Sequence, residues 1–307
     1  MTPSIEIRGL RKRFGAKLAL ADVDLSVAGA VLVGVIGPDG AGKTTLLRAL
    51  AGLLEVEAQS ARVLGFDLRG DVRALKARVG YVPQVFALQR ELSVLENLRF
   101  TGRLHRIPAH VFERRTHDLL ERTLLAEFAD RPAGALSGGM KQKLAIANAL
   151  LPEPALLILD ECTAGVDVLA RAEIFELLDE RRTQTLTLLA TSYLDEAERC
   201  DRLLHLDGGH VVASGTPEEL RSHAGIELYR AWGPAPHAIA RAARTLPFVT
   251  SARARGRSAR IEVPNDRTPG EAEVLRALVE RAGATLAERV AMDMESTLLA
   301  LANRRAS

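Results

Sequence analysis

The stretch that decides the fold is Gly37-Pro38-Asp39-Gly40-Ala41-Gly42-Lys43-Thr44-Thr45, which contains the pattern G-x-x-x-x-G-K-[ST]. An apolar run, residues 30–36, precedes it, and a helix-like run, residues 46–51, follows it. Strand, glycine loop and helix is the context in which this pattern binds phosphate. The glycines let successive backbone N–H groups point at phosphate oxygens, and the helix adds its positive N-terminal end. The stretch therefore predicts a nucleotide site, in which Lys43 reaches the β- and γ-phosphates and the Thr44 hydroxyl binds Mg²⁺.

Composition sets limits on the class of protein. The length of 307 residues exceeds one typical domain and predicts one large and one small domain. Hydrophobic residues at 47% and charged residues at 26% are typical of a soluble globular protein with a substantial core. The net charge of +2, from 41 basic and 39 acidic residues, gives no indication of nucleic-acid binding.

Two further features of the sequence concern its compartment. Cys162 and Cys200 lack metal-ligand spacing and indicate a reducing compartment rather than a disulfide scaffold. No apolar signal region follows Met1, and no run approaches the roughly 20 apolar residues of a membrane-spanning helix. We therefore expect a chain that does not cross a bilayer by itself.

Polar residues follow two apolar strand patterns beyond the glycine loop. Residues 155–159 form an apolar run, typical of a strand in a parallel sheet, that ends in Asp160 and Glu161. Ligands bind at the carboxyl ends of such strands, so this position favours a site over a surface turn. Asp160 is then a predicted Mg²⁺ ligand, and Glu161 the group that polarises the attacking water. Gln84 follows the strand pattern of residues 78–82 and is either a solvated residue or an Mg²⁺ ligand that also orients water.

The segment before the glycine loop predicts a pair of half-buried antiparallel strands. Residues 4–8 and 22–27 alternate apolar and polar side chains, as such strands do. Between them Arg11 to Gly15 predicts a basic turn with one aromatic residue, Phe14. Phe14 is either a core residue or a platform for a nucleobase, and the pattern alone favours the core.

A helical pattern covers residues 93–128, and Ser93 with Glu96 forms a capping box. We expect an inserted helical lobe over about residues 88–150. Within it the run Leu136-Ser137-Gly138-Gly139-Met140 precedes another helical stretch. Ser137 is a good N-cap, so this run predicts either an ordinary capped helix start or a second anion-binding helix N-terminus.

The order and spacing of these motifs resemble the nucleotide-binding subunit of an ABC transporter, from about Ile5 to Gly225. The resemblance implies an α/β fold of the P-loop ABC ATPase type, with a parallel core sheet, an antiparallel β subdomain and the inserted helical lobe. It implies ATP and Mg²⁺ as cofactors, with Phe14 stacked on the base, Gln84 as the Q-loop residue and Asp167 as the D-loop aspartate. It also implies two such domains packed head to tail, each ATP lying between one P-loop, residues 37–45, and the opposite chain's Ser137, Gly138 and Gly139.

The sequence departs from the family pattern at two positions. Cys162 stands where the family has proline, a change that we interpret as structural and without a redox role. Ser192 stands where the family has a switch histidine that contacts the γ-phosphate and holds the glutamate and water in place. Serine is shorter, cannot carry charge and has one hydroxyl donor, so the substitution predicts slow hydrolysis at a site with Glu161 intact. His205 falls in the middle of a strand pattern and is a poor substitute.

The run from Thr191 to Asp201 resembles the multidrug and antibiotic-export branch of bacterial ABC ATPases. This implies an ATPase that powers a separate ABC-2 type membrane permease for efflux of a drug or other hydrophobic compound. Such a subunit is cytoplasmic, lies at the inner face of the cell membrane, pairs with a second ATP-binding subunit and binds no nucleic acid. The alternatives are a regulatory or weakly hydrolysing nucleotide-binding module and a soluble ABC ATPase outside transport.

The last part of the chain, residues 226–307, predicts a small accessory domain after the ABC domain of residues 1–225. Strand and helix patterns alternate in the order strand-helix-strand-strand-helix-strand, which is typical of a ferredoxin-like α+β domain. A further helical pattern over residues 294–302 resembles the tail helix of export-type subunits. We expect the arginine cluster of this domain on a solvated strand face and loop rather than in a phosphate site; it comprises Arg253, Arg255, Arg257, Arg260 and Arg267.

Overall fold

The computed structural model describes residues 4–266 and 269–306, and divides the chain into two compact units that meet between Thr216 and Pro217. The division lies earlier than the boundary expected after residue 225. The helix α8 (Pro217–Ala224) falls in the second unit, where it packs against α11 (Met294–Ala306). Within the described ranges, no helix combines the length and the apolar character that a membrane crossing requires.

A six-stranded sheet forms the centre of the first unit, in the order β10-β9-β3-β8-β7-β6. All neighbouring strands are parallel except β10, which pairs antiparallel with β9. Every residue of β3, β7 and β8 is buried, as expected for parallel strands covered on both faces. The strands are β3 (Leu32–Ile36), β6 (Val79–Val82), β7 (Leu156–Asp160), β8 (Leu186–Ala190), β9 (Arg202–Asp207) and β10 (His210–Gly215).

A smaller antiparallel sheet has the order β2-β1-β4-β5. Its strands are β1 (Ser4–Phe14), β2 (Lys17–Ala28), β4 (Ser60–Val63) and β5 (Phe66–Asp67). The predicted basic turn over residues 11–15 is wrong, because β1 continues to Phe14, which pairs with Lys17 on β2. The turn is confined to Gly15 and Ala16, and Gly15 adopts a positive φ of 56°.

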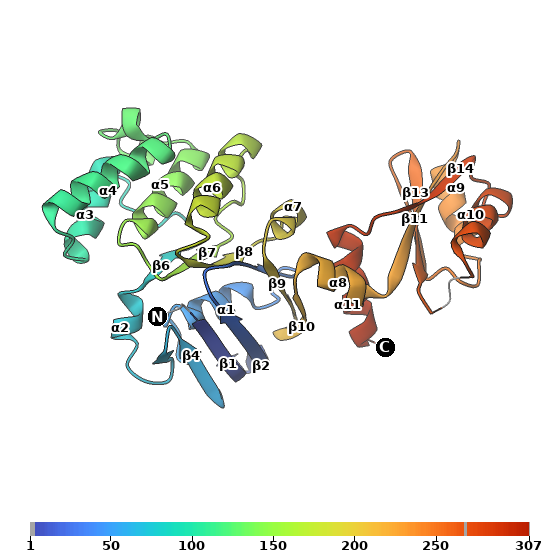
Figure 1. The fold of residues 1–307 in the computed structure, drawn as a ribbon, viewed down its shortest axis with the longest axis horizontal. Helices are drawn as coiled ribbons and strands as arrows, with labels where there is room; N and C mark the ends of the chain where they lie inside the picture. Colours follow the sequence, from blue (N-terminus) through green and yellow to red (C-terminus); the bar gives the residue numbers. More distant parts are fainter. Residues whose placement is uncertain (1–3, 267–268, 307) are drawn as a thin grey trace. The chain divides into compact units, whose positions relative to one another are not determined.

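Helix α1 (Lys43–Leu50) lies on one face of the central sheet, beside the antiparallel sheet (Figure 1). Its side chains Leu46, Leu47 and Leu50 are fully buried, in one core with alternate residues of the central strands such as Ile158 and Leu188. Figure 1 shows α5 (Gly138–Leu150) and α6 (Val168–Arg181) on the opposite face. The central sheet is therefore covered on both faces, and the P-loop joins β3 to the first of these helices.

The remaining helices of the first unit are short or belong to the helical lobe. The lobe contains α3 (Val94–Leu104) and α4 (Ala109–Arg122), followed by the 3₁₀ turns η1 (Ala126–Phe128) and η2 (Ala133–Ala135). The predicted capping box is confirmed: Ser93 Oγ accepts from the Glu96 amide at 3.1 Å, and Glu96 Oε2 accepts from the Ser93 amide at 2.8 Å. Outside the lobe lie α2 (Arg73–Lys76) and α7 (Leu194–Glu198).

The second unit has a four-stranded antiparallel sheet in the order β12-β13-β11-β14. Along the chain its elements are β11 (Ile226–Trp232), α9 (Pro236–Ala243), β12 (Ser251–Arg255), β13 (Ser258–Pro264), α10 (Glu271–Glu280) and β14 (Leu286–Val290). This is the predicted strand-helix-strand-strand-helix-strand order, with the strand arrangement of a ferredoxin-like domain.

Two of the clustered arginines in this unit contact acids at the start of α11. Arg255 donates to Glu295 at 2.7 Å, and Arg260 contacts Asp293. Arg253 is exposed, and Arg267 lies outside the described residues. These ion pairs attach α11 to the sheet.

Candidate nucleotide-binding site

The P-loop borders a cavity of about 670 Å³ whose other walls are Phe14, residues 17–19, Gln84, Glu161 and the turn Gly208-Gly209. Two glycines of the P-loop are required both by their positive φ and by close contacts that leave no room for a Cβ atom. Gly37 has a φ of 147°, and a Cβ there would lie 2.0 Å from the Leu206 carbonyl oxygen. Gly42 has a φ of 108°, and its Cβ would lie 2.8 Å from the Ala19 carbonyl oxygen. Any other residue at these two positions would displace the loop.

The Lys43 ammonium is held inside the loop rather than in solvent. The side chain is 5% exposed, and Nζ donates to the Gly37 carbonyl at 2.8 Å and to the Pro38 carbonyl at 3.3 Å. Nζ also lies 3.1 Å from Glu161 Oε1. The loop therefore holds a compact positive charge beside the acidic end of β7.

Three predicted catalytic residues converge on the fourth, Glu161. Besides Lys43, Gln84 Nε2 donates to Glu161 Oε2 at 3.0 Å, and Ser192 Oγ donates to Oε1 at 3.4 Å. The Ser192 contact is long for a hydroxyl donor, for which about 2.7–2.8 Å is usual. Glu161 itself has a φ of 51°, a left-handed conformation that is uncommon outside glycine and occurs at functional sites.

Asp160, directly before Glu161, is fully buried and accepts two hydroxyl donors. Thr44 Oγ1 donates to Oδ1 at 2.8 Å, and the Tyr81 hydroxyl donates to Oδ2 at 2.9 Å. Burial raises the pKa of Tyr81 to about 12, so its hydroxyl stays a donor at neutral pH. The sequence analysis did not identify Tyr81 as a site residue. The sequence feature that points to it is a residue with a polar hydroxyl in the apolar strand that precedes Gln84.

The family of the chain follows from comparison with known proteins. Residues 20–164, which contain the P-loop and Glu161, match the ABC transporter family model. The daunorubicin resistance ATP-binding protein DrrA3 of Streptomyces coeruleorubidus is 41% identical over 224 residues, which are 72% of this chain and 71% of that protein. The chain belongs to the ABC transporter family.

Two other comparisons agree with this assignment. The probable multidrug ABC transporter ATP-binding protein YbhF of Escherichia coli (strain K12) is 39% identical over 275 residues, 87% of this chain. This chain spans about half the length of that relative, 47%. A solved structure of an ATP-binding subunit of an ABC transporter matches at 32% identity with a TM-score of 0.67, over 72% of this chain and 93% of that one. The predicted ABC ATPase fold is thus confirmed.

Phe14 lies where a base could stack in this ABC subunit. The interpretation as a core residue is wrong: the side chain is 50% exposed and lines the P-loop cavity. Phe14 ends β1 beside the turn Gly15-Ala16. The Lys12 ammonium lies 5.3 Å from the ring centroid. Stacking of Phe14 on the adenine stays a prediction.

Ser137, Gly138 and Gly139, which the resemblance places against the ATP of a second chain, do not line the P-loop cavity of their own chain. Ser137 Oγ accepts from the Met140 amide at 3.3 Å, which confirms Ser137 as the N-cap of α5. Ser137 and Gly138 are exposed, whereas Gly139 packs against α6 so closely that a Cβ would lie 2.7 Å from Ala170 Cβ. Asp167 accepts from the Ala170 amide at 3.0 Å and caps α6.

The buried cysteines and His205 take no part in this site. Burial raises the pKa of both Cys162 and Cys200 to about 12, so both remain unreactive thiols. His205 is buried in β9, and burial lowers its pKa, which keeps the imidazole neutral. The interpretation of Cys162 as structural agrees with this environment.

The oxygen atoms of Asp160 and Thr44 are suitable ligands for a magnesium ion. In the part of the chain that the structure describes, no group of three or more His, Cys, Asp or Glu side chains could hold a metal ion. Mg²⁺ in nucleotide sites is bound by one or two protein oxygens together with phosphates and water. The adjacent Thr44 hydroxyl and Asp160 carboxylate, 2.8 Å apart, supply such a set.

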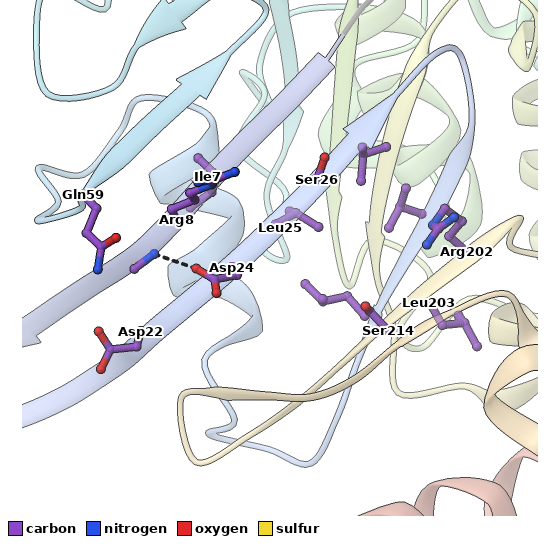
Figure 2. A pocket seen from close by; sticks show the side chains of 14 residues that line it. Ile7, Arg8, Asp22, Asp24, Leu25, Ser26, Gln59, Arg202, Leu203 and Ser214 are labelled. Carbon is purple, nitrogen blue, oxygen red and sulfur yellow. Dashed lines mark hydrogen bonds between the residues drawn. The ribbon is translucent and has the colours of Figure 1, made fainter. Parts of the chain in front are cut away.

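A larger cavity, of about 790 Å³, lies between β1-β2 and β9-β10, away from the P-loop (Figure 2). None of the predicted site residues lines it. Its acids are engaged with β1: Asp24 Oδ1 accepts from the Gly9 amide at 2.7 Å, and Asp22 pairs with Arg11 at 2.6 Å. The P-loop cavity is therefore the one that brings the predicted residues together.

Proposed function

We propose that this chain is the ATPase subunit of an exporter, in which it powers a separate ABC-2 type permease for a drug or another hydrophobic compound. The observation that carries the ATPase part is the convergence of Lys43, Gln84 and Ser192 on Glu161. The export part is supported by relatives that are named a multidrug transporter subunit and a daunorubicin resistance protein. The subunit would lie at the inner face of the cell membrane.

The site residues have distinct parts in ATP hydrolysis. Water attacks the γ-phosphate in line, and Glu161 accepts a hydrogen bond from that water and orients it. Lys43 stabilises the negative charge that develops on the phosphate oxygens. Thr44, Asp160 and the carbonyl of Gln84 would hold Mg²⁺, which supplies further charge stabilisation when bound. Through its amide, Gln84 keeps the Glu161 carboxylate in place.

We also propose that each ATP lies between two chains. The exposed Ser137 and Gly138 at the N-terminus of α5 would contact the γ-phosphate bound to the partner's P-loop. Two large apolar side chains beside Asp167, Val168 and Leu169, are 78% and 71% exposed, which supports a pairing surface there. The partner is a second copy or a different ATP-binding subunit.

A second exposed apolar group supports contact with the permease. Val85, which follows Gln84, is 73% exposed, and Phe100 and Leu104 on α3 are 58% and 70% exposed. We propose that these three side chains belong to one interaction site, because a contiguous apolar patch on a surface marks such a site. Contact at Val85 would connect the permease directly to Gln84 and so to Glu161.

A complementation experiment tests the composite site. Lys43→Ala chains lack a working P-loop, and Ser137→Arg chains lack a working helix N-terminus at α5, so each alone should be inactive in phosphate release. An equal mixture should recover up to about a quarter of wild-type activity, because half of the dimers then contain one intact site. No recovery would contradict the shared site.

A transport experiment tests export. Inverted vesicles that contain the subunit and its permease should take up the drug when ATP is added, and this uptake should be lost in Glu161→Gln.

A further inference from the structure

A buried carboxylate beside the site has no part in the mechanism above. Glu196, on α7, is 1% exposed, and its Oε2 accepts hydrogen bonds from two threonine hydroxyls. Thr163 Oγ1 donates at 3.0 Å, and Thr191 Oγ1 at 2.5 Å. Thr163 lies in the turn that follows Glu161, and Thr191 directly precedes Ser192. One carboxylate thus joins the two segments that carry Glu161 and Ser192.

Backbone hydrogen bonds extend the contacts of Glu196 both at Thr191 and at Thr163. The Tyr193 amide donates to Thr191 Oγ1 at 2.9 Å, so the chain is held on both sides of Ser192. On the other side, the Val166 amide donates to the Thr163 carbonyl at 3.1 Å and closes the turn after Glu161. Hydrogen bonds in such a chain polarise and strengthen one another. The Glu161 amide also donates to the Ala190 carbonyl at 3.1 Å, so Glu196 adds a side-chain link between these two segments to the link that the sheet already makes.

The second oxygen of Glu196 faces Arg171, in the first turn of α6. Glu196 Oε1 and Arg171 Nε are 3.8 Å apart, and among the described residues both atoms are buried without a hydrogen-bond partner. The guanidinium is held by Asp195, at 3.3 Å, and by the Tyr193 ring, with its carbon 4.2 Å from the centroid. A small approach of α6 to α7 would let Nε donate to Oε1, which removes the cost of two unsatisfied buried atoms.

We propose that Glu196 is a positioning residue that sets the spacing of Glu161 and Ser192, and that Arg171 couples this spacing to the position of α6. Because Asp167 caps α6, a shift of the Asp167 segment moves Arg171 relative to Glu196. Pairing of two chains at that segment would then tighten the carboxylate network and align Glu161. This inference rests on ATP hydrolysis at Glu161 and extends it to control by α6.

Three variants test the coupling in the full-length chain. Glu196→Gln keeps the shape and the oxygen that accepts both hydroxyls, but it turns an N–H group toward Arg171. Arg171→Met keeps the length and removes the charge. Each should lower kcat for ATP about tenfold with KM changed less than about twofold, because a small misplacement of a catalytic group costs rate rather than binding. The double variant should be no slower than the slower single variant, since both changes break one link.

Hydrogen exchange gives a readout that does not need turnover. In Glu196→Gln the neutral amide oxygen accepts the two threonine hydroxyls more weakly than the carboxylate does. The amides of Tyr193 and Val166 should therefore exchange faster than in wild type, while that of Leu46 in α1 stays unchanged. Glu262→Gln is the matched control: this buried glutamate also accepts a hydroxyl, from Ser296 at 3.0 Å, but lies in the second unit. It should leave kcat and these amides unchanged.

The outcomes separate this inference from the ATPase function itself. Wild-type kcat in Glu196→Gln, additive losses in the double variant, or unchanged exchange at Tyr193 and Val166 would each overturn it. A wild-type chain without Glu161-dependent turnover would contradict the proposed function, and the exchange measurement would still test the network around Glu196.

Discussion

Replacing Ser192 by histidine is predicted to accelerate ATP hydrolysis. In the structure Ser192 Oγ reaches Glu161 Oε1 at 3.4 Å, whereas Gln84 contacts the same carboxylate at 3.0 Å and Lys43 at 3.1 Å. Serine offers one short hydroxyl donor, whereas a histidine is longer and donates from a ring that can carry positive charge. The change therefore replaces the weakest contact to Glu161 with a group that can also reach the γ-phosphate.

The size of the effect follows from the contacts. A hydroxyl donor at 3.4 Å is near the limit of a hydrogen bond, so replacing Ser192 removes little stabilisation of Glu161. A hydrogen bond that involves a charged group contributes about 1.5–3 kcal/mol. Since about 1.36 kcal/mol corresponds to a tenfold change in rate, kcat should rise between about tenfold and about a hundredfold. KM should change little, because the P-loop and Phe14 are untouched.

Phosphate release at saturating MgATP measures this prediction. Ser192→Ala is the matched control and should hydrolyse at nearly the wild-type rate, since it removes only the long contact. Ser192→His combined with Glu161→Gln should be inactive, which assigns the gain to the same site. If the wild-type chain already hydrolyses ATP as fast as Ser192→His, the reasoning that Ser192 weakens the site is refuted.

Three other predictions follow from single contacts. Phe14→Ala should raise KM for ATP about tenfold at constant kcat, because stacking on a base contributes about 1–3 kcal/mol; Phe14→Trp should retain the wild-type KM. Tyr81→Phe leaves Asp160 one donor short, so the free energy of unfolding in urea should fall by about 1–2 kcal/mol and half-maximal activity should need more Mg²⁺. Burial raises the pKa of Glu196 above 4.5, so folding takes up protons. The free energy of unfolding of wild type relative to that of Glu196→Gln should be highest below pH 4.5 and should decline as pH rises through the folded pKa of Glu196. A difference in urea unfolding that does not depend on pH would contradict this.

The sequence predicts those parts of the site that are local in the chain. The P-loop is a continuous run in which each glycine has a backbone reason, so Lys43 and Thr44 could be assigned from spacing alone. Asp160 and Glu161 could be assigned because an apolar run ends at them, and the end of a buried strand is where ligands bind. Both inferences need only neighbouring residues and the direction of the strand.

The errors near Phe14 have a physical cause. The pairing of β1 with β2 shifts register between Ile7 and Leu10 and again around Lys12, so the alternation of side chains is broken. A strand with such bulges does not show a period of two, and its basic end was predicted as a turn. The general burial preference of phenylalanine then favoured the core, although a strand end beside a cavity leaves Phe14 half-exposed.

The network around Glu196 could not have been predicted from the sequence. Asp195, Glu196 and Glu198 are neighbours on one short helix, and no local pattern distinguishes the buried acid from the two exposed ones. What buries Glu196 is the packing of α7 near the ends of β7 and β8, which brings Thr163 and Thr191 to one carboxylate. Contacts of this kind depend on the order of the strands in the sheet.

The same strand order explains why the donors to Glu161 come from separate segments. In the central sheet β7 lies between β8 and β6, so the residues after these strands, Ser192 and Gln84, reach the end of β7 from its two sides. The next strand, β3, leads into the P-loop and brings Lys43. The scaffold therefore places a side chain at position 192 against Glu161 whatever its identity. The serine changes the strength of that contact and not its location, which is why restoring a stronger donor at this one position should be sufficient to increase the rate.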